Sequence, residues 1–143
     1  MMAIYTLLEN DNLALTIPLS GCSEVLDRKY LMDNLIETMK NFHGIGLSAS
    51  QCGVMERVFV MYSDVKKDEI IACFNPQILS EGTEMVMMDE GCLTWPGLWW
   101  KVRRPDHINC SFEDEYHSPT YIHHHNVLDV YTMHHLQHKV LQM

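Results

Sequence analysis

The stretch RVFVMYSDVKKDEIIACFNPQIL, residues 57–79, decides the fold because it combines two strands with a turn. Residues 57–62 have the Val and Phe content of a buried strand, and residues 70–74 have the character of the strand that returns. Residues 64–68 between them, four of which are charged, are typical of a turn. The stretch therefore predicts an antiparallel hairpin.

More strands are expected after this hairpin. The Asn75-Pro76 pair should end the returning strand, and residues 77–79 should begin another extended segment. Residues 84–88 and 98–102 are strand candidates on either side of a loop rich in glycine and proline. Residues 107–112 alternate apolar and polar side chains as a half-buried strand does.

Two helices are expected to flank the strands. In residues 24–41 apolar side chains recur at three- and four-residue spacing, Ser23 can cap the first turn, and the glycines of residues 44–46 can end the helix. Residues 127–141 repeat apolar and histidine side chains at helical spacings. The order of elements predicts an α+β fold, with antiparallel strands and hairpins packed around the C-terminal helix.

The composition indicates one ordinary globular domain over residues 1–143. The formal charge of −9 argues against nucleic acid as a partner of the chain by itself. No apolar run approaches the about 20 residues of a membrane helix, and the first residues do not form a signal peptide. A cytoplasmic protein without a membrane partner is expected. The 5 cysteines lack CxxC spacing, which argues against a structural zinc ribbon.

Three short segments hold the candidate functional residues. They are GIGLSASQ at 44–51, EGCLTWPG at 90–97 and HHLQH at 134–138. Their order and spacing resemble the peptide deformylases, whose motifs read GxGLAAxQ, EGCLS and HExDH. Ser48 stands where the family usually has Ala, and Thr94 where it usually has Ser. The resemblance implies removal of the formyl group from N-formylmethionine at the start of nascent polypeptides.

The first two motifs are expected to bind the substrate and to stabilise the reaction's oxyanion. Glycines let a ligand approach the backbone closely. The candidate substrate-binding residues are Gly44, Ile45, Gly46, Glu90 and Gly91. The resemblance implies that the Gln51 side chain and the backbone N–H of Leu93 donate to the oxyanion. Arg104 is a candidate partner for the carboxylate of Glu90.

The second and third motifs are expected to hold a metal ion. By resemblance Cys92 is a thiolate ligand of one divalent ion, Fe²⁺, with Zn²⁺, Ni²⁺ or Co²⁺ as other possibilities. His134 and His138 are four residues apart, so on a helix they share one face and can bind the same ion. The family's general-base Glu is replaced by His135, and its Asp by Gln137. An imidazole is a poorer base than a carboxylate beside a divalent ion, because its protonated form is cationic.

A second alignment register of the third motif is also open. It makes His135 the second ligand and places Tyr131 and Thr132 where the first His and the Glu belong. That register loses a ligand, so the first one, which keeps both imidazoles, is favoured. Neither register restores the Glu. The residues 134–138 can also be read as polar side chains on the face of a terminal helix.

Three functions are compatible with these residues. The first is a metal-dependent hydrolase acting on N-formylmethionyl nascent peptides, with the ribosome as a transient partner, in a short, phage-like form of the family. The second is a catalytically inactive homologue that binds formyl-Met peptides or metal without turnover. The third is a metal-storage module built on the histidine-rich end, in which His123 to His125 would take part. The third leaves the first two motifs unexplained.

Overall fold

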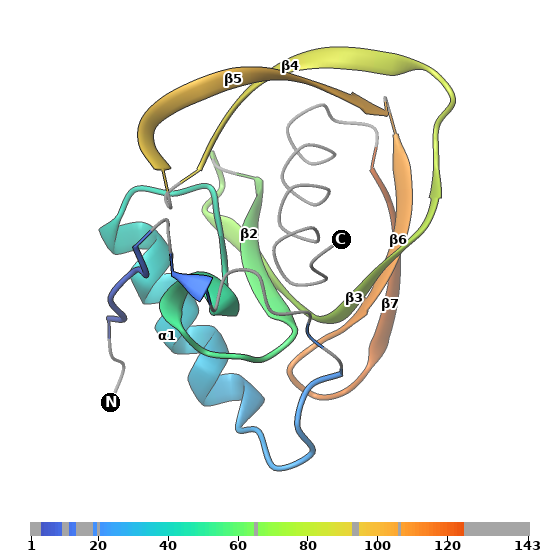
Figure 1. The fold of residues 1–143 in the computed structure, drawn as a ribbon. Coiled ribbons are helices and arrows are strands. Elements are labelled where there is room, and N and C mark those ends of the chain that lie inside the picture. The colour runs from blue at the N-terminus through green and yellow to red at the C-terminus, as the bar shows by residue number, and fades with distance from the viewer. Residues whose placement is uncertain are drawn as a thin grey trace.

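The computed structural model describes residues 4–9, 12–13, 19, 21–64, 66–92, 95–105 and 107–124. In this part of the chain a helix lies beside antiparallel strands (Figure 1), so the prediction of an α+β fold is confirmed. The predicted C-terminal helix lies outside the described residues. The helices in the described part are too short or too polar to span a bilayer.

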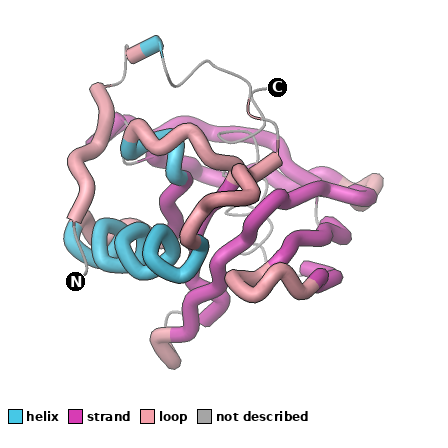
Figure 2. The backbone as a smooth tube through the Cα atoms, turned by 90° about the horizontal axis from the view of Figure 1, so that it is seen from below, coloured by secondary structure: helices cyan, strands magenta, loops and turns pink. Residues whose placement is uncertain are grey.

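The elements follow one another in a simple order. They are α1 (Arg28–Asn41), β1 (Gly46–Ser48), the 3₁₀ helix η2 (Ala49–Cys52), β2 (Val58–Asp64), β3 (Glu69–Glu81), β4 (Met85–Cys92), β5 (Trp95–Pro105), β6 (Ile108–Glu113) and β7 (Pro119–His124). The larger sheet has the strand order β1-β2-β3-β6-β7 and is antiparallel throughout. Strands β4 and β5 form a separate pair, inserted between the neighbours β3 and β6. Figure 2 shows α1 lying along one side of the strands.

Helix α1 begins at Arg28, four residues later than residues 24–41 predict. Its N-cap is Asp27, whose side chain accepts a hydrogen bond from Tyr30 N at 3.1 Å. Ser23 accepts a hydrogen bond within a turn that precedes the helix. A carboxylate at the N-cap satisfies a helix N–H and also favours the positive end of the helix dipole. Asp27 therefore competes successfully with Ser23 as the cap.

Helix α1 ends at Asn41, and a histidine rather than a glycine makes the turn. Gly44 N donates to Met39 O at 3.0 Å and His43 N to Lys40 O at 3.2 Å, which is the hydrogen-bond pattern of a Schellman motif. His43 takes the left-handed position with φ 56°. Among the described glycines only Gly53 has a positive φ. Gly44 and Gly46 therefore contribute through their small size and not through a positive φ.

Replacing His43 with glycine should therefore stabilise the protein. A left-handed conformation costs an L-residue about 1 kcal/mol, and the exposed His43 side chain offers little packing to lose. We expect the free energy of unfolding, measured by urea titration, to rise by about 0.5 to 1 kcal/mol. The matched control is His107→Gly, which lies at a negative φ and should destabilise. A lower stability for His43→Gly would contradict this account of the helix end.

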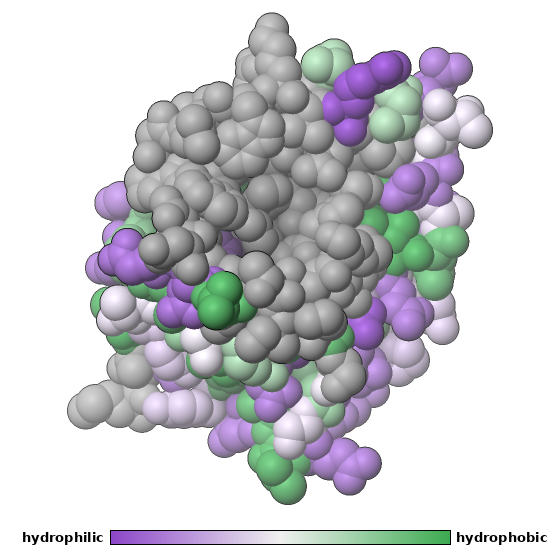
Figure 3. Space-filling model, in the orientation of Figure 1, coloured by the Kyte–Doolittle hydropathy of each residue, from purple (hydrophilic) through white to green (hydrophobic). Residues whose placement is uncertain are grey.

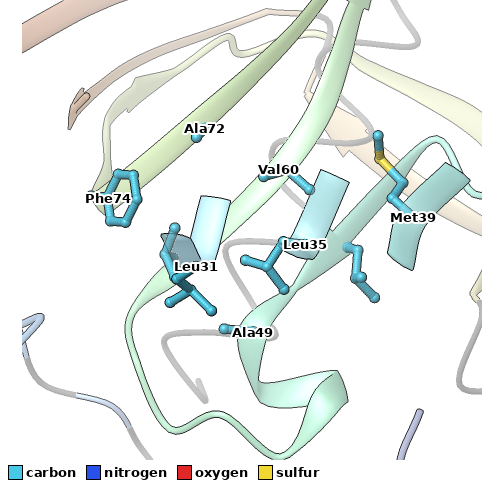
Figure 4. Close-up of a cluster of buried hydrophobic side chains, with 9 residues drawn as sticks. Leu31, Leu35, Met39, Ala49, Val60, Ala72 and Phe74 are labelled. Atoms are coloured by element: carbon cyan, nitrogen blue, oxygen red, sulfur yellow. The ribbon is translucent and has the colours of Figure 1, made fainter. Parts of the chain in front are cut away.

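A buried apolar cluster joins α1 to the larger sheet. It consists of Leu31, Leu35, Met39, Leu47, Ala49, Val58, Val60, Ala72 and Phe74. The α1 members recur every four residues, as a helix face packed on a sheet requires. Figure 4 shows Leu31, Leu35 and Met39 gathered with the core residues of the neighbouring strands. This cluster is the core beside which β1 and η2 are held.

The sheet is also buried on its other face. Side chains alternate along a strand, so Phe59 and Met61 point away from Val58 and Val60, yet all four are 0% exposed. The buried apolar residues outside the α1 cluster are Phe59, Met61, Cys73, Ile108, Cys110 and Phe112. A helix on one face cannot bury them. Figure 3 shows polar and apolar side chains interspersed on the described surface in that view.

Strand β3 continues through Asn75 and Pro76, so the predicted break there is wrong. The register between β3 and β6 shifts between Phe74 and Gln77, which marks a bulge. Asn75 takes φ 51°, and its N–H donates to Arg57 O at 2.9 Å. Proline lacks an N–H, and a bulge is a place where a strand tolerates that loss. The local signal is real, but it bends the strand instead of ending it.

The other predicted strands are present, and some of them are longer than expected. The hairpin predicted over 57–74 is confirmed by the pairing of β2 with β3. The strands predicted at 84–88 and 98–102 are confirmed as β4 and β5. They extend into residues 91–97, where a loop was expected, because β4 runs to Cys92 and β5 begins at Trp95. Strand β7 was not predicted, since its short sequence PTYIHH has little apolar alternation.

Candidate functional site

The first motif forms the edge of the larger sheet. Strand β1 pairs with β2, and its next residue opens η2. Ile45 O accepts a hydrogen bond from Tyr62 N at 3.0 Å, and Gly46 lies opposite Met61. Among the described residues no strand pairs with the outer edge of β1. The predicted substrate-binding residues Gly44 to Gly46 therefore lie where an extended chain can add to the sheet.

Gln51 is held in a single orientation beside this edge. Its side chain is buried, and its Oε1 accepts hydrogen bonds from Ser48 N and Ser48 Oγ, both at 3.0 Å. A backbone N–H can only donate, so the oxygen of the amide must face Ser48. The amide nitrogen, with its two donors, is then at the other end of the side chain. This is the polarity that an oxyanion-stabilising residue requires.

The backbone of Gln51 is anchored as firmly as its side chain. Leu8 N donates to Gln51 O at 2.8 Å, which ties the N-terminal segment to η2. Gly53 ends η2 at φ 78°, and a Cβ there would lie 3.4 Å from Leu8 Cδ2. A larger residue at Gly53 would be strained by its positive φ. The position of Gln51 is thus fixed by β1 on one side and by Leu8 on the other.

The second motif lies at the end of β4. The structure describes the backbone of Glu90, Gly91 and Cys92, and the register shifts between Gly91 and Cys92. Glu90 pairs with Trp100, whereas Arg104 pairs with Val86, four positions away. That separation corresponds to about 13 Å along the strand. The side chains of Glu90 and Arg104 lie outside the described part of the structure, so their ion pair stays a prediction.

The remaining predicted site residues are not part of the described structure. Leu93, His134, His135 and His138 lie outside the described residues. Within the described ranges, no group of three or more His, Cys, Asp or Glu residues is arranged to hold a metal ion. The structure brings together Gly44, Ile45, Gly46 and Gln51, which come from one continuous segment.

Ser48 is a functional candidate that the sequence reasoning missed. In the sequence it is only a departure from the family's usual Ala. The structure shows a reciprocal capping box between Ser48 and Gln51 at the start of η2. The S-x-x-Q spacing is a known sequence signal for such a box, so the contact was recognisable in principle.

Four of the cysteines are free thiols in the structure. Cys22, Cys52, Cys73 and Cys110 are free of disulfide bonds. Burial raises the pKa of Cys52 to about 12 and that of Cys110 to about 11, and it holds the pKa of Cys73 well above its usual value. These thiols stay protonated at neutral pH and are poor nucleophiles or metal ligands. Of the 5 cysteines, Cys92 is left as the thiolate candidate.

Comparison with known proteins agrees with this geometry. The family model of polypeptide deformylase matches residues 6–140. A peptide deformylase of Natranaerobius thermophilus is 38% identical over 105 residues, which cover 73% of this chain and 66% of the relative. The chain therefore spans less than two thirds of that relative's length.

Solved structures resemble the whole fold. The crystal structure of peptide deformylase from Thermotoga maritima has a TM-score of 0.90 at 23% identity, covering 99% of this chain and 94% of that one. A probable peptide deformylase from Synechococcus phage S-SSM7 has a TM-score of 0.88 at 24% identity, covering 97% and 95%. These similarities establish the fold.

Proposed function

Because the chain belongs to the polypeptide deformylase family, we propose that it is a metal-dependent hydrolase that removes the formyl group from N-formylmethionine on nascent polypeptides. The orientation of Gln51 carries this proposal. Its amide oxygen is fixed by Ser48, so the amide nitrogen has the orientation that donation to an oxyanion requires. We infer a cytoplasmic protein that meets nascent chains at the ribosome.

The substrate is proposed to bind as an added strand. The outer edge of β1 offers backbone groups that an extended peptide can pair with. The small residues Gly44 and Gly46 leave room for that peptide to approach closely. In this arrangement the formyl group would lie near Gln51 and the N–H of Leu93, which together would hold the oxyanion.

A thiolate and two imidazoles are the proposed ligands of one divalent ion. The donors are Cys92, His134 and His138, and this set suits Fe²⁺, Zn²⁺, Ni²⁺ or Co²⁺, with Fe²⁺ expected. The bound ion supplies a Lewis acid that lowers the pKa of the attacking water. His135 would accept the proton from that water and pass it to the departing amine, so that formate leaves and a free N-terminus forms.

Residues 127–141 are proposed to form a helix that packs on the second face of the larger sheet. The side chains of Phe59, Met61 and Cys73 are buried there, opposite α1. A buried sheet face requires a covering layer. A helix in this place would complete a single domain over residues 1–143 and would bring His134 and His138 to the interior.

Metal content measured together with formyl-Met-Ala-Ser hydrolysis tests the proposal. Protein purified anaerobically with Fe²⁺ or Ni²⁺ should contain one ion per chain and should hydrolyse the peptide. Cys92→Ser should lose the ion, whereas the control Cys22→Ser should keep it, because Cys22 Sγ only donates to Arg57 O at 3.2 Å. One ion without hydrolysis would indicate the inactive homologue. If neither the wild-type protein nor Cys22→Ser contains an ion, the proposed metal site is refuted.

A further inference from the structure

The hydroxyl of Ser48 makes contacts that an alanine at this position cannot make. Ser48 Oγ donates to Gln51 Oε1 at 3.0 Å, in addition to the bond from Ser48 N to the same oxygen. Ser48 Oγ also lies 3.3 Å from Ser50 Oγ. Both contacts use the hydroxyl, so an alanine at position 48 would lose them while keeping the hydrogen bond from the backbone N–H.

The direction of these hydrogen bonds is determined by the number of protons. Ser48 has one hydroxyl proton, which it donates in the hydrogen bond to Gln51 Oε1, an atom that can only accept. The contact with Ser50 Oγ must then be made by the Ser50 proton, which gives a chain from Ser50 through Ser48 to Gln51. All three side chains are at most 2% exposed. In such a dry environment successive hydrogen bonds polarise one another.

We propose that Ser48 is a positioning residue that orients the Gln51 amide and strengthens its N–H donors. Two hydrogen bonds to the amide oxygen draw electron density away from the nitrogen, so its protons become better donors. They also restrict a side chain that otherwise has several rotatable bonds, which prepares the donors before the substrate arrives. The inference rests on the proposed function, because the value of the donors is realised only in the transition state.

Ser48→Ala separates this role from a general effect on folding. We expect kcat for formyl-Met-Ala-Ser to fall about 3- to 10-fold, the loss of one neutral hydrogen bond, with KM within about twofold. Ser48→Thr, which keeps the hydroxyl, should recover most of the rate. The matched control is Thr38→Val, which removes a buried α1 hydroxyl that is bonded to Asn34 O and Tyr5 N. It should lower stability and leave kcat unchanged.

The coupling between the two residues can be measured directly. In a Gln51→Glu background the donor is already lost, so adding Ser48→Ala should change kcat by less than about twofold. If Ser48→Ala lowers kcat by the same factor in both backgrounds, the proposal is overturned. It is also overturned if the wild-type protein is active and Ser48→Ala leaves its kcat unchanged. A wild-type protein without hydrolysis would instead refute the proposed function.

The hydrogen bond itself can be tested without turnover. In Zn²⁺-loaded, ¹⁵N-labelled protein, the Gln51 side-chain amide is assigned by its absence from Gln51→Glu. Ser48→Ala should move its proton resonances upfield and speed their exchange with water several-fold, whereas Thr38→Val should do neither. Unchanged Gln51 amide signals in Ser48→Ala would overturn the proposal, even if the chain is inactive.

Discussion

Replacing His135 with glutamate should raise formyl-Met-Ala-Ser hydrolysis by about 10²- to 10⁴-fold, the contribution of a well-placed general base. In the favoured register His135 occupies the position of the family's catalytic Glu. An imidazole that accepts a proton becomes a cation beside a divalent ion, whereas a carboxylate becomes neutral. The measurement is kcat/KM at equal metal content in the two proteins.

The second register provides the matched control for this experiment. There the Glu position falls on Thr132, so Thr132→Glu tests that register with the same added carboxylate. A gain in His135→Glu alone would support His134 and His138 as the ligands. A gain in Thr132→Glu alone would assign His135 as a ligand instead. An unchanged rate in both variants would show that adding a general base is not enough to restore activity.

Gln51→Glu should lower kcat/KM by about 10²- to 10³-fold, which is about 3 to 4 kcal/mol. The substitution has almost the same shape, and its carboxylate still offers an acceptor to Ser48 N. Because only the N–H donors are lost, the fold should survive, whereas the stabilisation of the oxyanion should not. Rates should be compared only after metal content is shown to be equal, since a carboxylate near the site can alter ion binding.

Gln77→Glu is the control for the change in charge. Gln77 is exposed on β3 and lies opposite Ser111, in the strand pairing away from β1. Its replacement should leave kcat/KM within about twofold, because exposed charges at a distance are screened by salt. If Gln51→Glu also retains wild-type activity, Gln51 does not donate to the oxyanion.

The strands were predictable wherever local residues decide them. The β2–β3 hairpin follows from apolar runs on either side of a charged turn, and its pairing is as expected. The continuation of β3 through Asn75 depends on partners far away in sequence. Asn75 Oδ1 accepts from Cys22 N at 2.7 Å, and Asn75 Nδ2 donates to Glu113 Oε2 at 3.4 Å. No window of sequence around Asn75 contains those partners.

The candidate site was predictable in part for the same reason. The first motif lies on one short segment, so recognising Gln51 required no knowledge of tertiary structure. The register of β4 with β5, which places Glu90 opposite Trp100 and Arg104 opposite Val86, is not determined by either strand alone. The role of Ser48 depended on knowing that η2 begins directly after β1, within three residues of Gln51.

The insertion of β4 and β5 between β3 and β6 has a consequence for synthesis on the ribosome. Strand β3 can pair with β2 early, but its other neighbour, β6, begins about 27 residues after β3 ends, which is about 1 to 5 s of translation. The Arg28–Glu113 ion pair, which joins residues 85 apart, forms only after β6 is made. During that interval one edge of β3 is open to other chains. Rapid translation or chaperone binding in this window should therefore raise the yield of folded protein.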